Sequence, residues 1–173
     1  NRTVNRFEVF PSIHVGYTLP HEQKLTFAYS YRTNRPELFY MEPYITYRDY
    51  YTAEIGNPDI RPEYIHSYEL NYKKNIGEQV LQSSLFYRSR KDKIERLRVP
   101  YEAGVTLDSM ANVGNDHALG MELSGQFIVN KWWNLNVNGN VYYYKVVNNI
   151  NAGGKEETST NYDITCLLYT SPS

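Results

Sequence analysis

The sequence predicts an all-β protein in which antiparallel strands follow one another up and down through a single sheet. Apolar and polar residues alternate along seven stretches, and a period of two is typical of strands with one apolar face. Short turns and long polar connections alternate between these stretches. No segment shows a sustained helical period or the roughly 18 consecutive apolar residues of a membrane-spanning helix.

The first two predicted strands form a hairpin. In PSIHVGYTL, residues 11–19, every second side chain from Ile13 to Leu19 is large and apolar, and those between are polar or small. The turn PHEQ leads into KLTFAYSYR, residues 24–32, which repeats the pattern. Five more stretches alternate in the same way, with Phe86 as an exception: HSYELNYKK (66–74), LQSSLFYRSR (81–90), ALGMELSGQFIV (118–129), NLNVNGNVYYYKV (134–146) and NYDITCLL (from 161).

The connections give the two ends of the predicted sheet different characters. Short turns lie near residues 21, 76 and 131, and the long polar connections are 33–63, 92–115 and 148–160. The alternation fits two architectures: a soluble β-sandwich that binds a carbohydrate or another ligand, and a transmembrane barrel whose apolar face meets lipid. Strands of about 9 to 12 residues, tight turns at one end and long loops at the other favour the barrel.

Aromatic side chains support the barrel. The chain has 18 tyrosines, and its mean hydropathy is −0.62. Tyr and Trp prefer sites that are apolar on one side and wet on the other, so residues at both strand ends are predicted to form two interfacial girdles. The predicted members are Tyr17, Tyr72, Trp132 and Trp133 near the short turns, and Tyr29, Tyr31, Tyr87, Tyr142, Tyr143 and Tyr144 near the long loops.

The composition argues against several function classes. A net charge of −1 gives no global attraction to nucleic acid. The single cysteine, Cys166, excludes an internal disulfide, and the four histidines lack metal-ligand spacing. No nucleophile elbow or phosphate-binding glycine loop is present, so neither an enzyme nor a cofactor or metal site is predicted.

Four charged residues share the predicted polar face on successive strands: Arg32, Glu69, Arg88 and Glu122. Their signs alternate, which suggests a cross-strand charge ladder in the barrel interior. The alternative is that each is solvated separately in a wet interior.

Five motifs occur in order between about residues 10 and 150: FPSIHVGYTL, LTFAYSYRTNRPELFYMEPY, GNPDIRPEYIHSYELNY, SLFYRSRKDKI and NVGNDHALGMEL. This set resembles the C-terminal barrel region of TonB-dependent outer-membrane receptors, in the outer-membrane β-barrel family allied to SusC-like transporters. The resemblance implies a barrel of about 22 strands around an N-terminal plug, in the outer membrane of a Gram-negative bacterium. It also implies uptake of an iron chelate, a vitamin or an oligosaccharide, powered through TonB, with a surface lipoprotein as a further partner.

Under this resemblance the chain supplies six or seven strands of a partial barrel domain, residues 1–165, and is an internal piece of a longer protein. TonB would act through a missing N-terminal region. Residues 166–173, CLLYTSPS, resemble translated sequencing-adapter sequence and are predicted to be a non-native tail.

The connection 33–63 is the candidate ligand-binding loop. Its aromatic rings would stack on sugars or flat chelates, and its charged groups would orient them. The candidates are Tyr40, Tyr44, Tyr47, Arg48, Asp49, Tyr50 and Tyr51; the alternative is that the tyrosines pack the loop against its neighbours. The basic run at 87–98 suggests contact with lipopolysaccharide phosphates, with a solvated strand extension as the alternative.

Prolines and glycine around this loop predict a rigid hinge. Pro62 fixes its own φ and biases the residue before it toward extended geometry, so it sets the angle at which the next strand begins. Gly56 and Asn57 suit a sharp bend, and Arg61 and Glu63 are predicted to make local structural pairs rather than contacts with a ligand. The predicted structural motif comprises Arg35, Pro36, Gly56, Asn57, Pro58, Arg61, Pro62 and Glu63.

Overall fold

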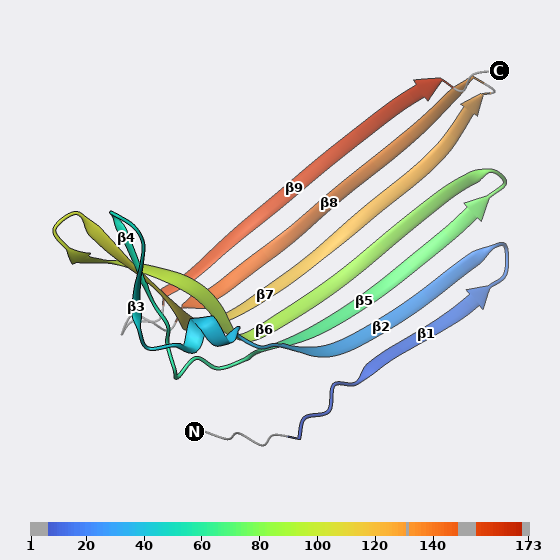
Figure 1. The fold of residues 1–173 in the computed structure, drawn as a ribbon. Helices are drawn as coiled ribbons and strands as arrows, with labels where there is room; N and C mark the ends of the chain where they lie inside the picture. Colours follow the sequence, from blue (N-terminus) through green and yellow to red (C-terminus); the bar gives the residue numbers. More distant parts are fainter. Residues whose placement is uncertain (1–6, 131, 149–154, 171–173) are drawn as a thin grey trace.

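The structure is a computed structural model and describes residues 7–130, 132–148 and 155–170. Within these residues nine strands make one sheet, and the short 3₁₀ turn η1 (Leu38–Met41) follows the second strand (Figure 1). The strands are β1 (Ser12–Leu19), β2 (Gln23–Asn34), β3 (Ile45–Asp49), β4 (Thr52–Ile55), β5 (Glu63–Ile76), β6 (Gln79–Glu102), β7 (Val105–Asn130), β8 (Trp133–Asn148) and β9 (Lys155–Thr170).

Seven long strands form the predicted up-and-down sheet. β1, β2, β5, β6, β7, β8 and β9 lie side by side in this order, and each pairs antiparallel with the next (Figure 1). These seven correspond one to one with the seven predicted strands. The prediction of an all-β, antiparallel, up-and-down sheet is therefore confirmed.

The prediction of long irregular loops is wrong for much of 33–63 and 92–115. β6 continues to Glu102 and β7 begins at Val105, so the two strands form one long hairpin. β3 and β4 form a second hairpin. Between Arg90 and Lys93 the β6–β7 register shifts, and Asp92 has a φ of 56°. This bulge changes which side chains share a face, so the sequence alternation is interrupted although the strand continues.

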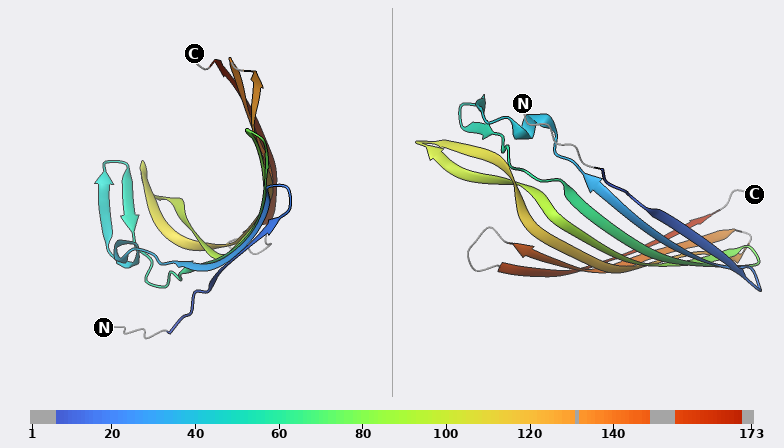
Figure 2. Two further views of the ribbon diagram at one scale, coloured as in Figure 1. Left: turned by 90° about the vertical axis from the view of Figure 1, so that its right-hand side faces the viewer. Right: turned by 90° about the horizontal axis from the view of Figure 1, so that it is seen from below.

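β7 changes partner at the level of this bulge. Its residues 106–109 pair in parallel with β4, whereas from Gly114 onward the strand pairs with β8. Figure 2 shows the sheet curved into an open trough, with β3, β4 and the ends of β6 and β7 bent toward its concave side. The loop end is therefore a small second section of sheet, folded over one side of the main one. The predicted connection 148–160 is shorter, because β8 ends at Asn148 and β9 begins at Lys155; residues 149–154 lie outside the described residues.

One face of the main sheet is apolar across all seven strands. The register places Tyr29, Tyr68, Tyr87, Leu119 and Tyr143 in one lateral row. Leucines of this face are about half exposed, for example Leu85 at 48% and Leu119 at 49%, and no second sheet packs on it in the described part of the chain. A continuous apolar face of this size is unfavourable in water, so the soluble β-sandwich is not favoured.

The aromatic girdles are only partly as predicted. Register places Tyr17, Tyr72 and Trp133 on the apolar face near the short turns, and Tyr29, Tyr31, Tyr87 and Tyr143 on the same face nearer the loops. Tyr142 and Tyr144 lie on the opposite face, because consecutive strand residues point to opposite sides. A hypothetical Cβ on Gly120 would lie within 2.7 Å of both Phe86 and Tyr142, so this glycine makes room for aromatic rings on the polar face.

The predicted charge ladder is not formed. Arg32, Glu69, Arg88 and Glu122 share the polar face, but they lie at different heights along their strands. Glu69 is opposite Ala28 and Phe86, and Arg88 is opposite Ser67 and Ala118. None of the four takes part in an ion pair within the described residues. A shared face fixes only the side of the sheet, whereas pairing also requires matching register.

The buried residues gather at the loop end. Ala53, Ile60 and Val113 are the buried apolar residues of the described chain, and the buried carboxylates are Glu63, Asp108 and Asp116. Residues 166–170 continue β9 in register with β8, and Cys166 is exposed. The non-native origin of 166–173 stays a prediction, and residues 1–6 and 171–173 lie outside the described chain. None of the described helical segments is long and apolar enough to cross a membrane.

Candidate ligand pocket and the network beneath it

The segment GNPDIRP between β4 and β5 anchors the loop end. Asn57 Oδ1 accepts a hydrogen bond from Asp59 N at 3.0 Å, which closes a turn, and Asn57 Nδ2 donates to the Met110 carbonyl on β7 at 3.1 Å. Gly56 serves close packing rather than the bend, because a Cβ there would lie 2.4 Å from the Glu42 carbonyl oxygen. Its N–H donates to that oxygen at 3.0 Å. The segment thus joins η1 to β7.

The β6 bulge is tied to this segment. Asn112 accepts from Arg61 N at 2.8 Å and donates to the carbonyl oxygens of Arg61 and Asp92. The Arg61 guanidinium pairs with the Asp92 carboxylate at 2.8 Å, and Asn115 Oδ1 accepts from Asp92 N. The prediction of local pairs is therefore wrong for Arg61, because its partners Asp92 and Asn112 lie on β6 and β7 and its contacts hold the bulge.

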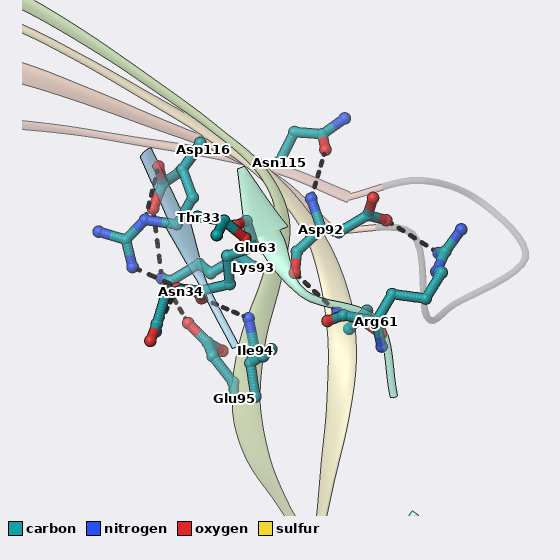
Figure 3. A network of polar contacts seen from close by, with 12 residues as sticks. Thr33, Asn34, Arg61, Glu63, Asp92, Lys93, Ile94, Glu95, Asn115 and Asp116 are labelled. Atoms are coloured by element: carbon teal, nitrogen blue, oxygen red, sulfur yellow. Dashed lines mark hydrogen bonds and ion pairs between the residues drawn. The ribbon is translucent and has the colours of Figure 1, made fainter. Parts of the chain in front are cut away.

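Two buried carboxylates lie on the other side of the bulge (Figure 3). Glu63, the first residue of β5, accepts hydrogen bonds from Ile94 N at 2.7 Å and Asn34 Nδ2 at 2.9 Å. Asp116 accepts from the Tyr144 hydroxyl at 2.6 Å. Arg90 lies 3.8 Å from Glu63 and 3.6 Å from Asp116, and Lys93 lies 3.7 Å from Asp116. This junction network, Glu63, Arg90, Lys93, Asp116 and Tyr144, links β5, β6, β7 and β8 where the loop section begins.

Above the network lies a pocket between η1, the β3–β4 hairpin and the extended ends of β6 and β7. The space between its lining atoms amounts to about 380 Å³, a value that includes open solvent, so the pocket is an open concavity rather than an enclosed cavity. Aromatic rings form one wall, and paired charges form another. It is lined by Phe39, Tyr40, Glu42, Tyr44, Thr46, Glu54, Ile55, Gly56, Arg96, Asp108, Ser109 and Met110.

Arginine–carboxylate pairs shape the charged wall. Arg98 binds Asp108 through two hydrogen bonds, Nε to Oδ1 at 2.7 Å and Nη2 to Oδ2 at 2.8 Å. Arg96 Nη1 lies 3.4 Å from Asp108 Oδ2 and 3.5 Å from Glu54 Oε1, and Arg48 lies 3.2 Å from the same Glu54 oxygen. Glu54 Oε1 is buried, yet no group in the described chain gives it a well-aligned hydrogen bond. Arg48 and Arg96 compensate its charge, and a well-aligned donor in the pocket would add a hydrogen bond to these ion pairs.

Only two of the seven predicted ligand-binding residues line this pocket, Tyr40 and Tyr44. Tyr47 lies opposite Ala53 in the hairpin, Arg48 pairs with Glu54, and the Asp49 carboxylate accepts from Tyr51 N. Tyr50 and Tyr51 are exposed at the hairpin tip. The prediction missed Phe39, Thr46, Asp108 and Met110. Asp108 lies in sequence within a stretch assigned to a loop, and only pairing of β4 with β7 brings it to the others.

The basic run at 87–98 is divided among several environments. Arg88 lies on the polar face, Arg90 and Lys93 belong to the junction network, and Arg96 and Arg98 pair with Asp108. Lys91 lies opposite Tyr64 on β5 and is exposed. The run is a strand extension, and its contact with lipopolysaccharide phosphates stays a prediction. Arg35 lies 3.6 Å from Glu8 after β2, and Pro36 separates β2 from η1. No cluster with metal-ligand composition occurs in the described residues.

The charged wall has a defined pH response. The hydrogen bonds from Arg98 hold the pKa of Asp108 below its ordinary value of 3.8. A lowered folded-state pKa gives stability that is complete above about pH 3.8 and is lost as the pH falls through the folded-state value. We expect amide hydrogen exchange of 95–110 to show constant protection from pH 8 to about 5 and a loss only at strongly acidic pH. In Arg98→Gln the loss should begin at higher pH; identical profiles for the two proteins would contradict this assignment.

A sheet of long antiparallel strands with one apolar face, tight turns at one end and polar hairpins at the other defines a section of the wall of a transmembrane β-barrel. The sequence gives the family directly. Residues 1–170 match the outer membrane protein β-barrel family, so the chain belongs to that family and is a protein of the Gram-negative outer membrane. No significant match was found among curated protein sequences.

Solved structures with the same fold are receptors. The siderophore receptor PirA from Pseudomonas aeruginosa aligns with a TM-score of 0.64 at 16% identity, over 92% of this chain and 34% of the receptor. A mutant of the ferric enterobactin receptor PfeA from Pseudomonas aeruginosa, in complex with enterobactin, aligns with a TM-score of 0.60 at 15% identity, over 87% of this chain and 27% of the receptor. The chain thus spans about a third or less of these receptors, and at this identity the likeness concerns the fold.

Proposed function

We propose that this chain forms part of the barrel wall and ligand-binding surface of a TonB-dependent receptor that takes up a scarce, bulky ligand. The observation that carries the proposal is the pocket at the loop end, with Tyr40, Tyr44 and Phe39 beside the ion-paired carboxylate of Glu54. An apolar pocket with a few convergent polar groups is the usual form of a small-molecule site. Its position at the end with long hairpins is the extracellular side of a barrel of this type.

Among the three ligand classes that the sequence suggests, an iron chelate is the first to test. The solved structures of the same fold are named as receptors for a siderophore and for ferric enterobactin. Aromatic rings stack on flat chelates, and a buried carboxylate oxygen accepts a hydrogen bond from a ligand N–H or O–H. A vitamin or an oligosaccharide offers similar groups and remains the alternative. Energy transfer through TonB and a surface lipoprotein partner belong to the same proposal.

The pocket is tested in the full-length receptor by comparing Tyr44→Ala with Tyr50→Ala. Both tyrosines are exposed on the same loop, but only Tyr44 lines the pocket, while Tyr50 is 92% exposed at the tip. Loss of an aromatic contact of about 1–2 kcal/mol should weaken binding roughly 5- to 30-fold for Tyr44→Ala and leave Tyr50→Ala near wild type. Isothermal titration with a panel of iron chelates, vitamins and oligosaccharides measures this, with surface expression as the control.

Two outcomes would contradict the proposal. Equal affinity of wild type and Tyr44→Ala for a ligand that the receptor transports would remove the pocket from the binding surface. Uptake of that ligand at the wild-type rate in cells without TonB would remove the receptor class.

A further inference from the structure

Two tyrosine–histidine pairs of the same design lie on the apolar face, near its loop end. The Tyr29 hydroxyl lies 3.0 Å from His66 Nδ1, and the Tyr87 hydroxyl lies 3.0 Å from His117 Nδ1. In both pairs the rings stack with centroids 6.2 Å apart. In each case the histidine lies two residues beyond the position opposite the tyrosine, on the loop side. The arrangement is therefore repeated at two places along the sheet.

Register places further cations beside these histidines. His66 lies opposite Ser89, Ser89 opposite His117, and His117 opposite Lys145. Lys91 is exposed and lies two residues from Ser89 toward the loops. It is opposite Tyr64, whose ring stacks on Tyr31, so Lys91 is on the same face as the histidines. We call His66, Lys91, His117 and Lys145 the basic row.

The chemistry of the row favours an anion. In the tautomer in which the tyrosine O–H donates to Nδ1, the histidine proton lies on Nε2, and this tautomer gives each imidazole one N–H donor for an external acceptor. Neighbouring strands are about 4.8 Å apart, so the two histidines, two strands apart, are separated by about 10 Å. Two carboxylates are also near: Glu156 pairs with Lys145 at 2.8 Å, and Glu8 accepts from the Tyr64 hydroxyl at 2.8 Å. Within the described residues, no ion pair involves His66, Lys91 or His117.

We propose that the basic row binds phosphate groups of phosphorylated lipid in the outer leaflet of the outer membrane. The basic row lies on the loop side of the tyrosines, and the apolar row of Leu70, Leu85 and Met121 lies directly on their other side. A lipid aligned with this face places its acyl chains on the leucines and its headgroup at the level of the row. A soluble anion would contact the basic row but not the apolar surface next to it. The ligand pocket is a separate site, because it lies on the loop section. Lipid, rather than the transported ligand, is thus the occupant that fits both parts of the surface.

The test uses full-length receptor reconstituted in phosphatidylcholine vesicles, with lipid A carrying two phosphates, lipid A carrying one phosphate, or no lipid A. We expect tighter binding of the two-phosphate lipid, measured by native mass spectrometry and by the shift in unfolding temperature. His66→Gln combined with His117→Gln should weaken it about 5- to 30-fold, and adding Lys91→Gln should weaken it further.

A matched control exists in the same chain. His14 faces the opposite side of β1, and His21 lies in the short turn at the other end of the sheet, so His14→Gln with His21→Gln should leave lipid binding unchanged. Wild-type lipid binding by the His66/His117 variant would overturn the proposal, as would an equal loss in the control variant. Equal binding of the two-phosphate lipid and plain phosphatidylcholine would overturn it as well. Titration of the transported ligand distinguishes this result from the proposed function, because the row does not line the pocket.

Discussion

Replacement of Gly114 by alanine should prevent correct pairing of β7 with β8 and destabilise the full-length barrel by at least about 3 kcal/mol. Gly114 has a φ of 144°, and a Cβ there would lie 1.9 Å from the Val147 carbonyl oxygen. No flexible side chain can move aside, since the obstacle is backbone of the partner strand. The loss should appear as a lower urea midpoint and less heat-modifiable folded protein on gels.

Gly139→Ala is the matched control. Gly139 lies in the middle of β8, and a Cβ there would meet its nearest atoms, the Asp163 carbonyl oxygen and Ile164 Cγ1, at 3.8 and 3.9 Å. These are ordinary contacts, so the change in stability should stay within about 1 kcal/mol. If both glycine variants unfold at the same urea midpoint as wild type, the close approach of Gly114 to the β8 backbone at Val147 is wrong.

The second large effect is expected from Glu63→Ala. This side chain is 3% exposed and serves Ile94 N, Asn34 and Arg90 at once. Its removal leaves the part-buried Ile94 N–H without this acceptor and removes one of the two carboxylates that compensate the Arg90 guanidinium, at a cost of about 2–4 kcal/mol. Because the network holds the start of the loop section, hydrogen exchange should increase first in the bulge around Asp92 and Lys93.

Glu69→Ala is the matched control, because it removes the same carboxylate side chain six residues further along β5. Glu69 is exposed on the polar face and takes part in no ion pair of the described residues, so its loss should change stability by no more than about 0.5 kcal/mol. An equal loss of stability in the two variants would show that the contacts of Glu63 in the junction network do not stabilise the fold.

Alternation along the strands determined the seven long strands, their order and their apolar face. Residues that alternate in a strand lie on opposite faces, and a one-residue slip would expose the wrong set, so the sequence specifies this part strongly. Proline chemistry placed Pro62 just before the third strand, and in the structure β5 begins at the next residue, Glu63, three residues earlier than the alternation predicted. Position along the strand groups the tyrosines 142–144 in one girdle, whereas the alternation of faces separates Tyr143 from Tyr142 and Tyr144.

Tertiary structure decided the loop end. The Asp92 bulge, the partner change of β7 and the parallel pairing with β4 are long-range events, and local periodicity carries no information about them. They bring Glu54 next to Arg96 and Asp108, residues that are more than 40 positions apart in the chain. The sequence by itself therefore determined a lipid-facing sheet, because burial of alternate side chains is a local pattern. Only the fold decided where the pocket and its charges lie, because these depend on which distant strands share an edge.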